Sequence, residues 1–448
     1  MDGRRPRPLL VVGSMRSGTT LLNRLLAAHP AIAMLYHPTR FFESKAALRD
    51  LGPAGYVAKL TEEYGYFADM GEAVQARVQA ALSALPEGAA AGEVYGTLML
   101  ALAGRPGAEV IGEKYAGRGR EMQPFRQGVP DGRIIMVVRD PRDVLLSNRK
   151  RVEQEVDVET FWRGAHLMAL DDWAQLAVLH RAFDQAQGGV YMHILYEDLV
   201  RAPEAGVRRL CQFLDVPFVA SMLDEGALRH EDGREWSANT SHGEPYRAVS
   251  AGSVARYRDG LSAGEMLLVE ALLADHLRFF GYALDSVVPD TDALVEACDL
   301  YLALGRALRE HAVPNPQLYA PTRSEDDNLL WFVDKVVAVS GLDRAEFVKG
   351  FLAGRRVTAR EVGHRSDRAA EAIVAEIVAL RRSLEWMPPE IVRLADRMSE
   401  GGHSLQALVS LPGTVEALTR ELRNVRSAVD RFPTALNVVK RAIRKPPE

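Results

Sequence analysis

Residues 8–22 read PLLVVGSMRSGTTLL, and they decide the fold. An apolar run that is typical of a buried strand passes into a polar, glycine-containing turn and then into an apolar-periodic helix. The first N–H groups of a helix lack partners inside the helix and lie at the positive end of its macrodipole, so a turn of small residues before them binds an anion. The stretch therefore predicts an α/β domain with a phosphate site between a strand and a helix.

The spacing of Gly13 and Gly18 matches that of a Walker A loop. Thr19, however, occupies the position where nucleotide-hydrolysing families have lysine, and Arg16 lies inside the loop. We therefore expect an anion site that lacks the fingerprint of a nucleoside triphosphatase.

A second motif lies at residues 133–147, RIIMVVRDPRDVLLS, and reads as a buried strand that turns into a helix. Arg139 stands at the predicted strand end. Ser147 follows on the helix, where its hydroxyl can join the guanidinium on one phosphate. The alternating arginines and aspartates can instead neutralise one another as a surface ion-pair cluster. The two interpretations make different uses of Arg139, as a phosphate ligand or as one partner in an ion pair.

The loop at residues 14–21, followed by Ala28-His29-Pro30, resembles the first nucleotide motif of the sulfotransferase superfamily, in the form with arginine at the lysine position. Tyrosylprotein sulfotransferases and many bacterial carbohydrate or natural-product sulfotransferases share this form. The resemblance implies that the loop binds the 5′-phosphosulfate of 3′-phosphoadenosine-5′-phosphosulfate (PAPS), and that the second motif binds its 3′-phosphate. Weaker matches at 191–200 and 253–282 extend the resemblance over about residues 6–285.

The resemblance also implies roles for single residues. The residues expected to bind PAPS are Arg16, Ser17, Gly18, Thr19, Thr20, Arg139, Ser147, Tyr196 and Arg256. Arg16 is expected to act in catalysis as well, because a permanent cation stabilises charge on the leaving phosphate but cannot donate a proton. Lys114 is the second expected cation, since Gly112-Glu113-Lys114-Tyr115 is similar to a Glu/Asp-Lys-Thr-Pro motif of related bacterial enzymes. Here Tyr115-Ala116 replaces Thr-Pro.

The general base is the open question. In the tyrosylprotein branch a glutamate precedes Thr-Arg, whereas this chain has Pro38 before Thr39-Arg40. His37 lies one residue earlier, and a histidine side chain has a pKa suited to proton transfer near neutrality, so His37 is the first candidate. Glu43 and Glu113 are the alternatives, and a purely structural role for His37 is the competing interpretation.

Strand patterns at residues 8–13, 109–112, 133–138 and 190–195 alternate with helical ones. This alternation predicts a P-loop-like parallel sheet flanked by helices. Such sheets bind ligands at the carboxyl ends of their strands, where both nucleotide motifs lie. A helical insertion over about residues 44–104 forms either a wall of the acceptor pocket or a packed cap.

The chain is expected to divide into a sulfotransferase domain, residues 1–285, and an all-helical C-terminal extension, residues 286–448. Apolar seams at 373–398 and 415–432 predict either a homo-oligomer or partner docking, or else an intramolecular helical bundle. The basic end at 436–445 can form an amphipathic helix that touches an anionic membrane surface, or it can be a solvated terminus.

The composition is that of an ordinary globular protein, with 448 residues, 47% of them hydrophobic and 26% charged. A net charge of −5 gives no general attraction to nucleic acid. Two cysteines, Cys211 and Cys298, cannot form a disulfide framework and are expected to be buried. Apolar runs are too short for a signal segment or a membrane span, so a cytoplasmic location is expected.

These patterns predict a bacterial-type sulfotransferase that moves a sulfuryl group from PAPS to a hydroxyl of a carbohydrate, glycolipid or small natural product. Because no set of His, Cys and Asp with metal-ligand spacing stands out, the reaction is expected to need no metal. A P-loop-type kinase that uses ATP is one alternative, disfavoured by Thr19. The other is a non-catalytic nucleotide-binding scaffold with a helical tail that docks partners. The acceptor pocket is expected to come from insertions, about which the fold is silent.

Overall fold

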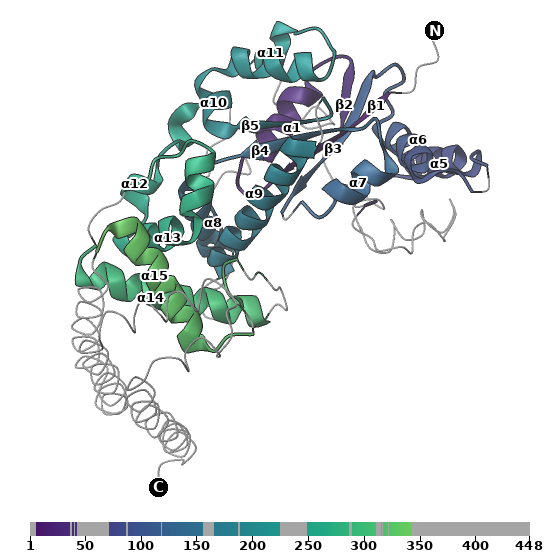
Figure 1. Ribbon diagram of the computed structural model, residues 1–448. Coiled ribbons are helices and arrows are strands. Elements are labelled where there is room, and N and C mark those ends of the chain that lie inside the picture. Colours follow the sequence, from purple (N-terminus) through teal and green to yellow (C-terminus); the bar gives the residue numbers. More distant parts are fainter. Residues whose placement is uncertain are drawn as a thin grey trace, which may run out of the picture. The chain divides into compact units, whose positions relative to one another are not determined.

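The computed structural model describes the following residues (Figure 1): 6–35, 38–39, 41–42, 71–86, 88–117, 119–155, 165–186, 189–224, 249–285, 289–310, 315, 317–320 and 322–342. The chain divides into two compact units, residues 1–352 and 353–448, and every described residue lies in the first. His37, Glu43, the two predicted apolar seams and the basic end fall outside the described residues.

In the described part of the chain, five parallel strands form one sheet in the order β2-β3-β1-β4-β5. The strands are β1 (Arg7–Gly13), β2 (Ile32–Met34), β3 (Val110–Ala116), β4 (Arg133–Val138) and β5 (Tyr191–Leu195). Gly13 at the end of β1 pairs with Ala116 of β3 and Val137 of β4, so the carboxyl ends of the three central strands lie side by side. The sheet confirms the predicted fold class. The sequence analysis did not predict β2.

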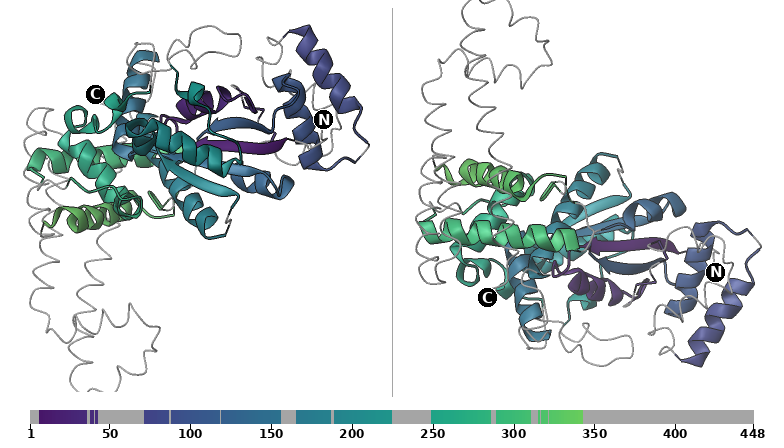
Figure 2. Two further views of the ribbon diagram at one scale, coloured as in Figure 1. Left: turned by 90° about the horizontal axis from the view of Figure 1, so that it is seen from above. Right: turned by 90° about the horizontal axis from the view of Figure 1, so that it is seen from below.

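Side chains alternate along the strands and contribute to two apolar clusters, one on each face of the sheet. Leu9 and Val11 of β1 share one cluster with residues of α1 (Thr19–Ala27), α10 (Tyr196–Arg201), α11 (Pro203–Phe213) and the 3-10 helix η2 (Ala220–Leu223). Leu10 and Val12 share the other with residues of α6 (Ala91–Ala103), α7 (Met122–Gly128), α8 (Pro141–Glu155), α9 (Met168–Ala186) and α13 (Ala263–Phe279). Figures 1 and 2 show helices on both faces.

The described part of the predicted helical insertion consists of α5 (Glu72–Ser83) and α6. Val78 and Leu82 of α5 and Tyr95 and Leu98 of α6 are fully buried in the same cluster. These buried side chains fit the packed-cap interpretation for this part of the insertion.

Two helices beyond residue 285 also belong to the first unit. They are α14 (Thr291–Glu310) and α15 (Glu325–Ser340), which follow α13 in Figure 1. The rings of Tyr301 and Phe332 stack between them with centroids 4.4 Å apart, inside the cluster that includes α13. Both helices agree with the predicted helical extension, and an independent domain over residues 286–448 stays a prediction.

Three short elements complete the described chain. They are the 3-10 helices η1 (Ala165–Leu167) and η4 (Ala251–Ser253) and the helix α12 (Tyr257–Gly260). Both cysteines are buried, as expected. Within the described ranges, no helix has the length and apolarity that a membrane span requires.

Candidate active site

Residues 14–18 join β1 to α1 in a closed turn. Ser17 donates to the carbonyl oxygen of Ser14 twice, from its backbone N at 3.1 Å and from its Oγ at 2.7 Å. Arg16 and Gly18 have φ angles of 68° and 100°, both in the left-handed region. The turn thus curls back on itself directly before the helix, as the sequence predicts for an anion-binding loop.

The two glycines of the loop are required by close approach of neighbouring elements. A Cβ on Gly13 would lie 2.6 Å from Oγ of Ser17 and 2.8 Å from the carbonyl oxygen of Val137 on β4. A Cβ on Gly18 would lie 2.4 Å from the ring of Tyr196. Both contacts are shorter than carbon atoms tolerate, so a side chain at either position would push β4 or α10 away from the loop.

Helix α1 begins at Thr19 with neither a side-chain cap nor an acidic residue in its first turn. Leu22 N donates to the carbonyl oxygen of Gly18 at 3.1 Å and opens the helical hydrogen-bond series. The N–H groups of residues 19–21 precede that bond and belong to the positive end of the helix. This terminus therefore offers backbone donors to an anion.

Arg139 and Ser147 both contact Arg16 in the loop, and their predicted role in binding the 3′-phosphate stays a prediction. Nη1 of Arg139 donates to the carbonyl oxygen of Arg16 at 2.9 Å, and Nη2 donates to the carbonyl oxygen of Ser253 at 2.7 Å. Its guanidinium lies 4.6 Å from the ring centroid of Tyr196. Ser147 accepts a hydrogen bond from Nε of Arg16 at 3.1 Å. The structure thereby joins the two nucleotide motifs through Arg16.

Arg139 retains one unused donor in this arrangement. Its side chain is 7% exposed, and its Nε is buried with no hydrogen-bond partner in the part of the chain that the structure describes. A buried donor without a partner costs free energy, which an anionic ligand would recover.

Asp143 fixes the segment that carries Arg256. Its two carboxylate oxygens accept hydrogen bonds from Tyr257 N at 3.0 Å and from Ala255 N at 2.8 Å. Ala255 has a φ of 58°, a left-handed conformation that these bonds hold in place. Burial raises the pKa of Asp143, while the Arg139 charge opposes that rise. Arg256 therefore belongs to a segment held beside Arg139, although its own Nε donates to the carbonyl oxygen of Gly252.

Arg142 is occupied by an ion-pair cluster. It donates to both carboxylate oxygens of Asp140, at 2.9 and 2.7 Å, and to Glu270 at 2.7 Å. The ring of Tyr257 covers the guanidinium at 4.2 Å. The two interpretations of the second motif therefore apply to different arginines: Arg142 is neutralised inside the domain, and Arg139 faces the loop.

Glu113 and Lys114 lie on opposite faces of β3. Glu113 is fully buried and accepts hydrogen bonds from Thr39 N at 2.5 Å, Thr39 Oγ1 at 3.1 Å and Tyr95 OH at 2.8 Å. Burial raises the pKa of Glu113 to about 7. Burial lowers the pKa of Lys114, and the charge of Arg24 on α1 lowers it further. Glu113 thus anchors the segment that follows His37, and Lys114 lies on the α1 side of the sheet.

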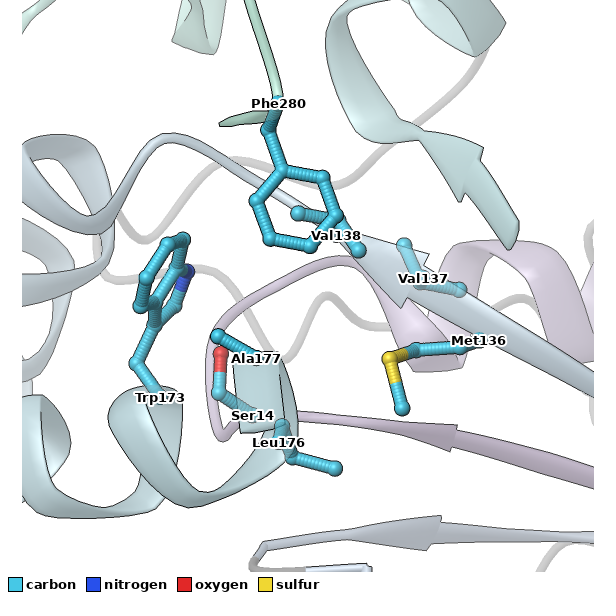
Figure 3. Close-up of a pocket in the computed structure, with 8 residues that line it drawn as sticks. All are labelled: Ser14, Met136, Val137, Val138, Trp173, Leu176, Ala177 and Phe280. Carbon is cyan, nitrogen blue, oxygen red and sulfur yellow. The ribbon is translucent and has the colours of Figure 1, made fainter. Parts of the chain in front are cut away.

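A small pocket lies behind the loop (Figure 3). Its lining residues are Ser14, Met136, Val137, Val138, Trp173, Leu176, Ala177 and Phe280. Trp173 Nε1 donates to the carbonyl oxygen of Arg139 at 2.8 Å, so one wall of the pocket also holds the strand end in place. The Ser14 hydroxyl is buried there without a hydrogen-bond partner among the described residues.

Sequence reasoning missed Thr39 and Tyr95 as partners of Glu113. Thr39 directly follows Pro38 in the segment that contains the candidate base, and its polar side chain could have indicated a hydrogen bond to a buried group. Tyr95 lies in an Ala-rich helical segment and carries no local signal of its contact. The sequence analysis also missed His180, Asp184 and His193, which the fold brings together even though no metal-ligand spacing stood out.

One protein family matches part of this chain. Residues 8–220 match the model described as the sulfotransferase family. The sulfotransferase domain of the curacin biosynthetic pathway is 18% identical, with 63% of this chain and 100% of that chain covered and a TM-score of 0.41. The sulfotransferase domain of the Synechococcus PCC 7002 olefin synthase is 20% identical, with 63% and 98% covered and a TM-score of 0.41.

Retinol dehydratase in a complex with retinol and PAP is 18% identical, with 61% of this chain and 82% of that chain covered and a TM-score of 0.35. No curated protein sequence matches the chain. The matched region contains the loop, Arg139 and Ser147, the residues that the fold has brought together. Residues 8–220, which carry this site, thus match the sulfotransferase family.

Proposed function

We propose that this chain transfers a sulfuryl group from PAPS to a hydroxyl of a carbohydrate, a glycolipid or a small natural product. One observation carries the proposal: the buried guanidinium of Arg139 reaches the loop at the start of α1, beside Arg16 and Ser147. Two cationic groups next to one helix N-terminus suit a donor with one phosphate at its 5′ position and another at its 3′ position.

The 5′-phosphosulfate fits the loop itself. The N–H groups at the start of α1, together with the hydroxyls of Thr19 and Thr20, supply short donors, and Arg16 supplies a full positive charge. The 3′-phosphate fits Arg139 and Ser147, because the unused Nε of Arg139 and a nearby hydroxyl can donate to the same group. Tyr196 packs on both Gly18 and Arg139 and thereby connects the loop with the second motif.

The transfer step needs in-line placement and charge stabilisation. The bond between sulfur and the bridging oxygen of PAPS breaks, a new bond forms between sulfur and the acceptor oxygen, and the acceptor proton passes to a base. Arg16 stabilises the charge that grows on the leaving phosphate. Lys114, whose pKa is lowered by burial, is the second cation that we assign to this step. No metal is assigned to it.

We assign the acceptor proton to His37, because the residues that follow it are anchored by hydrogen bonds. Pro38 and Thr39 follow it directly, and Thr39 is tied to Glu113 by two hydrogen bonds. Glu113 is fully buried and its oxygens already accept these bonds and that of Tyr95, so it fits a positioning role better than that of a base.

The proposal is tested by following labelled sulfate from PAPS into a panel of hydroxyl acceptors from the three classes. The wild-type chain is expected to label an acceptor. His37→Ala is expected to lose about 100- to 10,000-fold in turnover, the usual contribution of general-base catalysis, while its affinity for adenosine 3′,5′-bisphosphate stays unchanged.

His276→Gln, on α13, is the matched control and is expected to keep its activity. Near-normal turnover by His37→Ala would remove His37 from the mechanism. Transfer of phosphate from ATP by the wild-type chain, with none of sulfate from PAPS, would favour the kinase alternative. Nucleotide binding without transfer to any acceptor would favour the scaffold alternative.

A further inference from the structure

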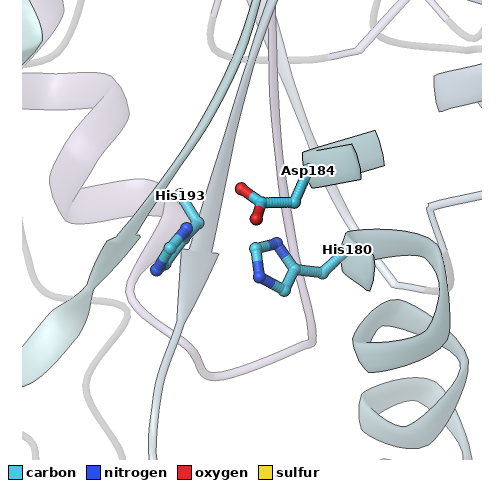
Figure 4. A group of neighbouring side chains, drawn as sticks. All are labelled: His180, Asp184 and His193. Carbon is cyan, nitrogen blue, oxygen red and sulfur yellow. The ribbon is translucent and has the colours of Figure 1, made fainter. Parts of the chain in front are cut away.

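Two histidines and an aspartate gather between helix α9 and the edge strand β5 (Figure 4). His180 and Asp184 lie one helical turn apart on α9, and His193 lies on β5. One imidazole nitrogen of each histidine and one carboxylate oxygen all lie within 4.8 Å of one another. The group is separate from the loop, and neither the transfer mechanism nor the two nucleotide motifs use it.

The burial of the three side chains differs in a way that suits a site open on one side. His180 is 1% exposed, His193 is half-buried and Asp184 is exposed. An ion can therefore reach the group from the side of Asp184. The histidines supply the inner part of the site and the aspartate supplies its exposed outer part.

The surroundings fix the His180 ring. The Tyr191 hydroxyl lies 2.6 Å from Nδ1 of His180, and it also donates to Sδ of Met136 at 3.5 Å. The rings of Phe279 and Phe280 pack against His180 with centroids 5.5 and 4.9 Å away. A ring held on several sides loses little entropy when it binds an ion, which favours affinity.

The two imidazoles meet edge to face, beside the Asp184 carboxylate. Their ring centroids are 4.5 Å apart, and burial lowers the pKa of both rings, that of His180 to about 4. An imidazole nitrogen with a lone pair is the group through which histidine binds a metal. The guanidinium of Arg181, also on α9, lies over the Phe279 ring at 4.5 Å and donates to the carbonyl oxygen of Asp275 at 3.2 Å, and its charge contributes to the lowered pKa of His180.

We propose that His180, Asp184 and His193 bind one divalent transition-metal ion, Zn²⁺ in the first place. Two imidazole nitrogens and one carboxylate oxygen are ligands that Zn²⁺ takes together, with water in the fourth position. Tetrahedral Zn²⁺ holds its ligand atoms about 3.3 Å apart, so the separations here, none above 4.8 Å, must close by at most about 1.5 Å. We expect the exposed Asp184 side chain to make most of this movement.

The ion would clamp α9 onto the edge strand of the sheet. His180 and Asp184 hold it from the helix and His193 holds it from β5, whose only described partner strand is β4. A metal that binds the folded chain and not the unfolded one stabilises the fold. The site is thus a structural device, independent of the sulfuryl transfer proposed above.

The test uses the full chain after removal of bound metal by a chelator. Zn²⁺ is titrated in competition with a chromophoric indicator, for the wild-type chain and for His193→Gln and Asp184→Asn. His276→Gln and Asp275→Asn, both on α13, are the matched controls. The wild-type chain and the controls are expected to bind one equivalent of Zn²⁺. The two site variants are expected to bind this equivalent at least about tenfold more weakly.

A second readout separates lost binding from lost folding. Zn²⁺ is expected to raise the midpoint of thermal unfolding of the wild-type chain and the controls, and to leave that of His193→Gln unchanged, while all variants keep the wild-type far-UV circular dichroism without metal. Co²⁺ is expected to give the visible absorption of a tetrahedral site in the wild-type chain and not in His193→Gln. Equal Zn²⁺ stoichiometry and affinity in the wild-type chain and both site variants would overturn the proposal.

Discussion

At the residue scale, Arg139 and Arg142 lie three residues apart in the second motif but have opposite electrostatic surroundings. Arg142 is enclosed by Asp140 and Glu270, which cancel its charge. Arg139 donates mainly to carbonyl oxygens, and its nearest carboxylate oxygen, on Asp143, is 4.0 Å away. Positive charge therefore remains available at Arg139 for an anionic ligand, and not at Arg142.

Glu113 gives a prediction about stability and pH. Its pKa in the folded chain, about 7, lies above the ordinary value of 4.5. The folded state therefore holds a proton that the unfolded state has already released between these pH values. The stabilisation from this group is complete below pH 4.5 and is lost as the pH rises to about 7.

Glu113→Gln removes this dependence because glutamine does not titrate. The free energy of unfolding of the wild-type chain, measured by urea denaturation relative to Glu113→Gln, is expected to fall by about 2 to 3 kcal/mol between pH 5 and pH 8. The exposed Glu72→Gln is the control and is expected to follow the wild-type curve. Parallel curves for the wild-type chain and Glu113→Gln would contradict the assignment.

Residues of the site differ in how far the sequence predicts them. Arg139 and Ser147 are predictable because their distance from a strong strand pattern fixes where they emerge. The contact between Tyr95 and Glu113, and that between His180 and His193, depend on which helix packs on which strand. No local pattern encodes such pairings, so they appear only in the folded chain.

At the element scale, strand prediction depends on continuous apolar runs. The predicted ranges of β1, β4 and β5 agree closely with the observed strands, and β1 and β4 are the most continuously apolar of them. β2 has three residues, too few for a pattern. β3 continues past the predicted end at residue 112 because Glu113 is buried by hydrogen bonds rather than by apolarity.

Helix α8 provides a prediction at this scale through Asp143, which lies in its first turn. Asp143→Ala removes the acceptor of Ala255 N and Tyr257 N and leaves the segment of Arg256 without its anchor. We expect this variant to lose about tenfold in affinity for adenosine 3′,5′-bisphosphate, equivalent to one weakened charge-assisted hydrogen bond.

Calorimetric titration of the full chain measures this loss. The exposed Asp259→Ala, on α12, is the control and is expected to bind like the wild-type chain. Unchanged affinity of Asp143→Ala would show that the segment 255–257 takes no part in nucleotide binding.

At the scale of the whole molecule, one apolar cluster connects the sheet with α13, α14 and α15. The two helices after residue 285 thus add to the core of the first unit. Their sequence periodicity predicts helices but does not indicate which elements they pack against. Association through the seams at 373–398 and 415–432 stays a prediction, as do the cytoplasmic location and contact of the basic end with a membrane surface.

The central claim is that the loop and Arg139 together bind a nucleotide with phosphates at both its 5′ and 3′ positions. The most direct measurement is calorimetric titration of the full chain with adenosine 3′,5′-bisphosphate, with 5′-AMP and with ATP, the last with and without Mg²⁺. Arg139→Gln is compared with the exposed control Arg278→Gln, and circular dichroism checks that both fold.

The wild-type chain is expected to bind adenosine 3′,5′-bisphosphate more tightly than 5′-AMP or ATP, without a requirement for Mg²⁺. Arg139→Gln is expected to weaken binding of the bisphosphate about 30- to 100-fold, the equivalent of about 2 to 3 kcal/mol for a charge-assisted contact. Its affinity for 5′-AMP is expected to stay nearly unchanged. Tighter binding of ATP with Mg²⁺ than of the bisphosphate, or equal losses for both adenosine nucleotides in a folded Arg139→Gln, would contradict the account.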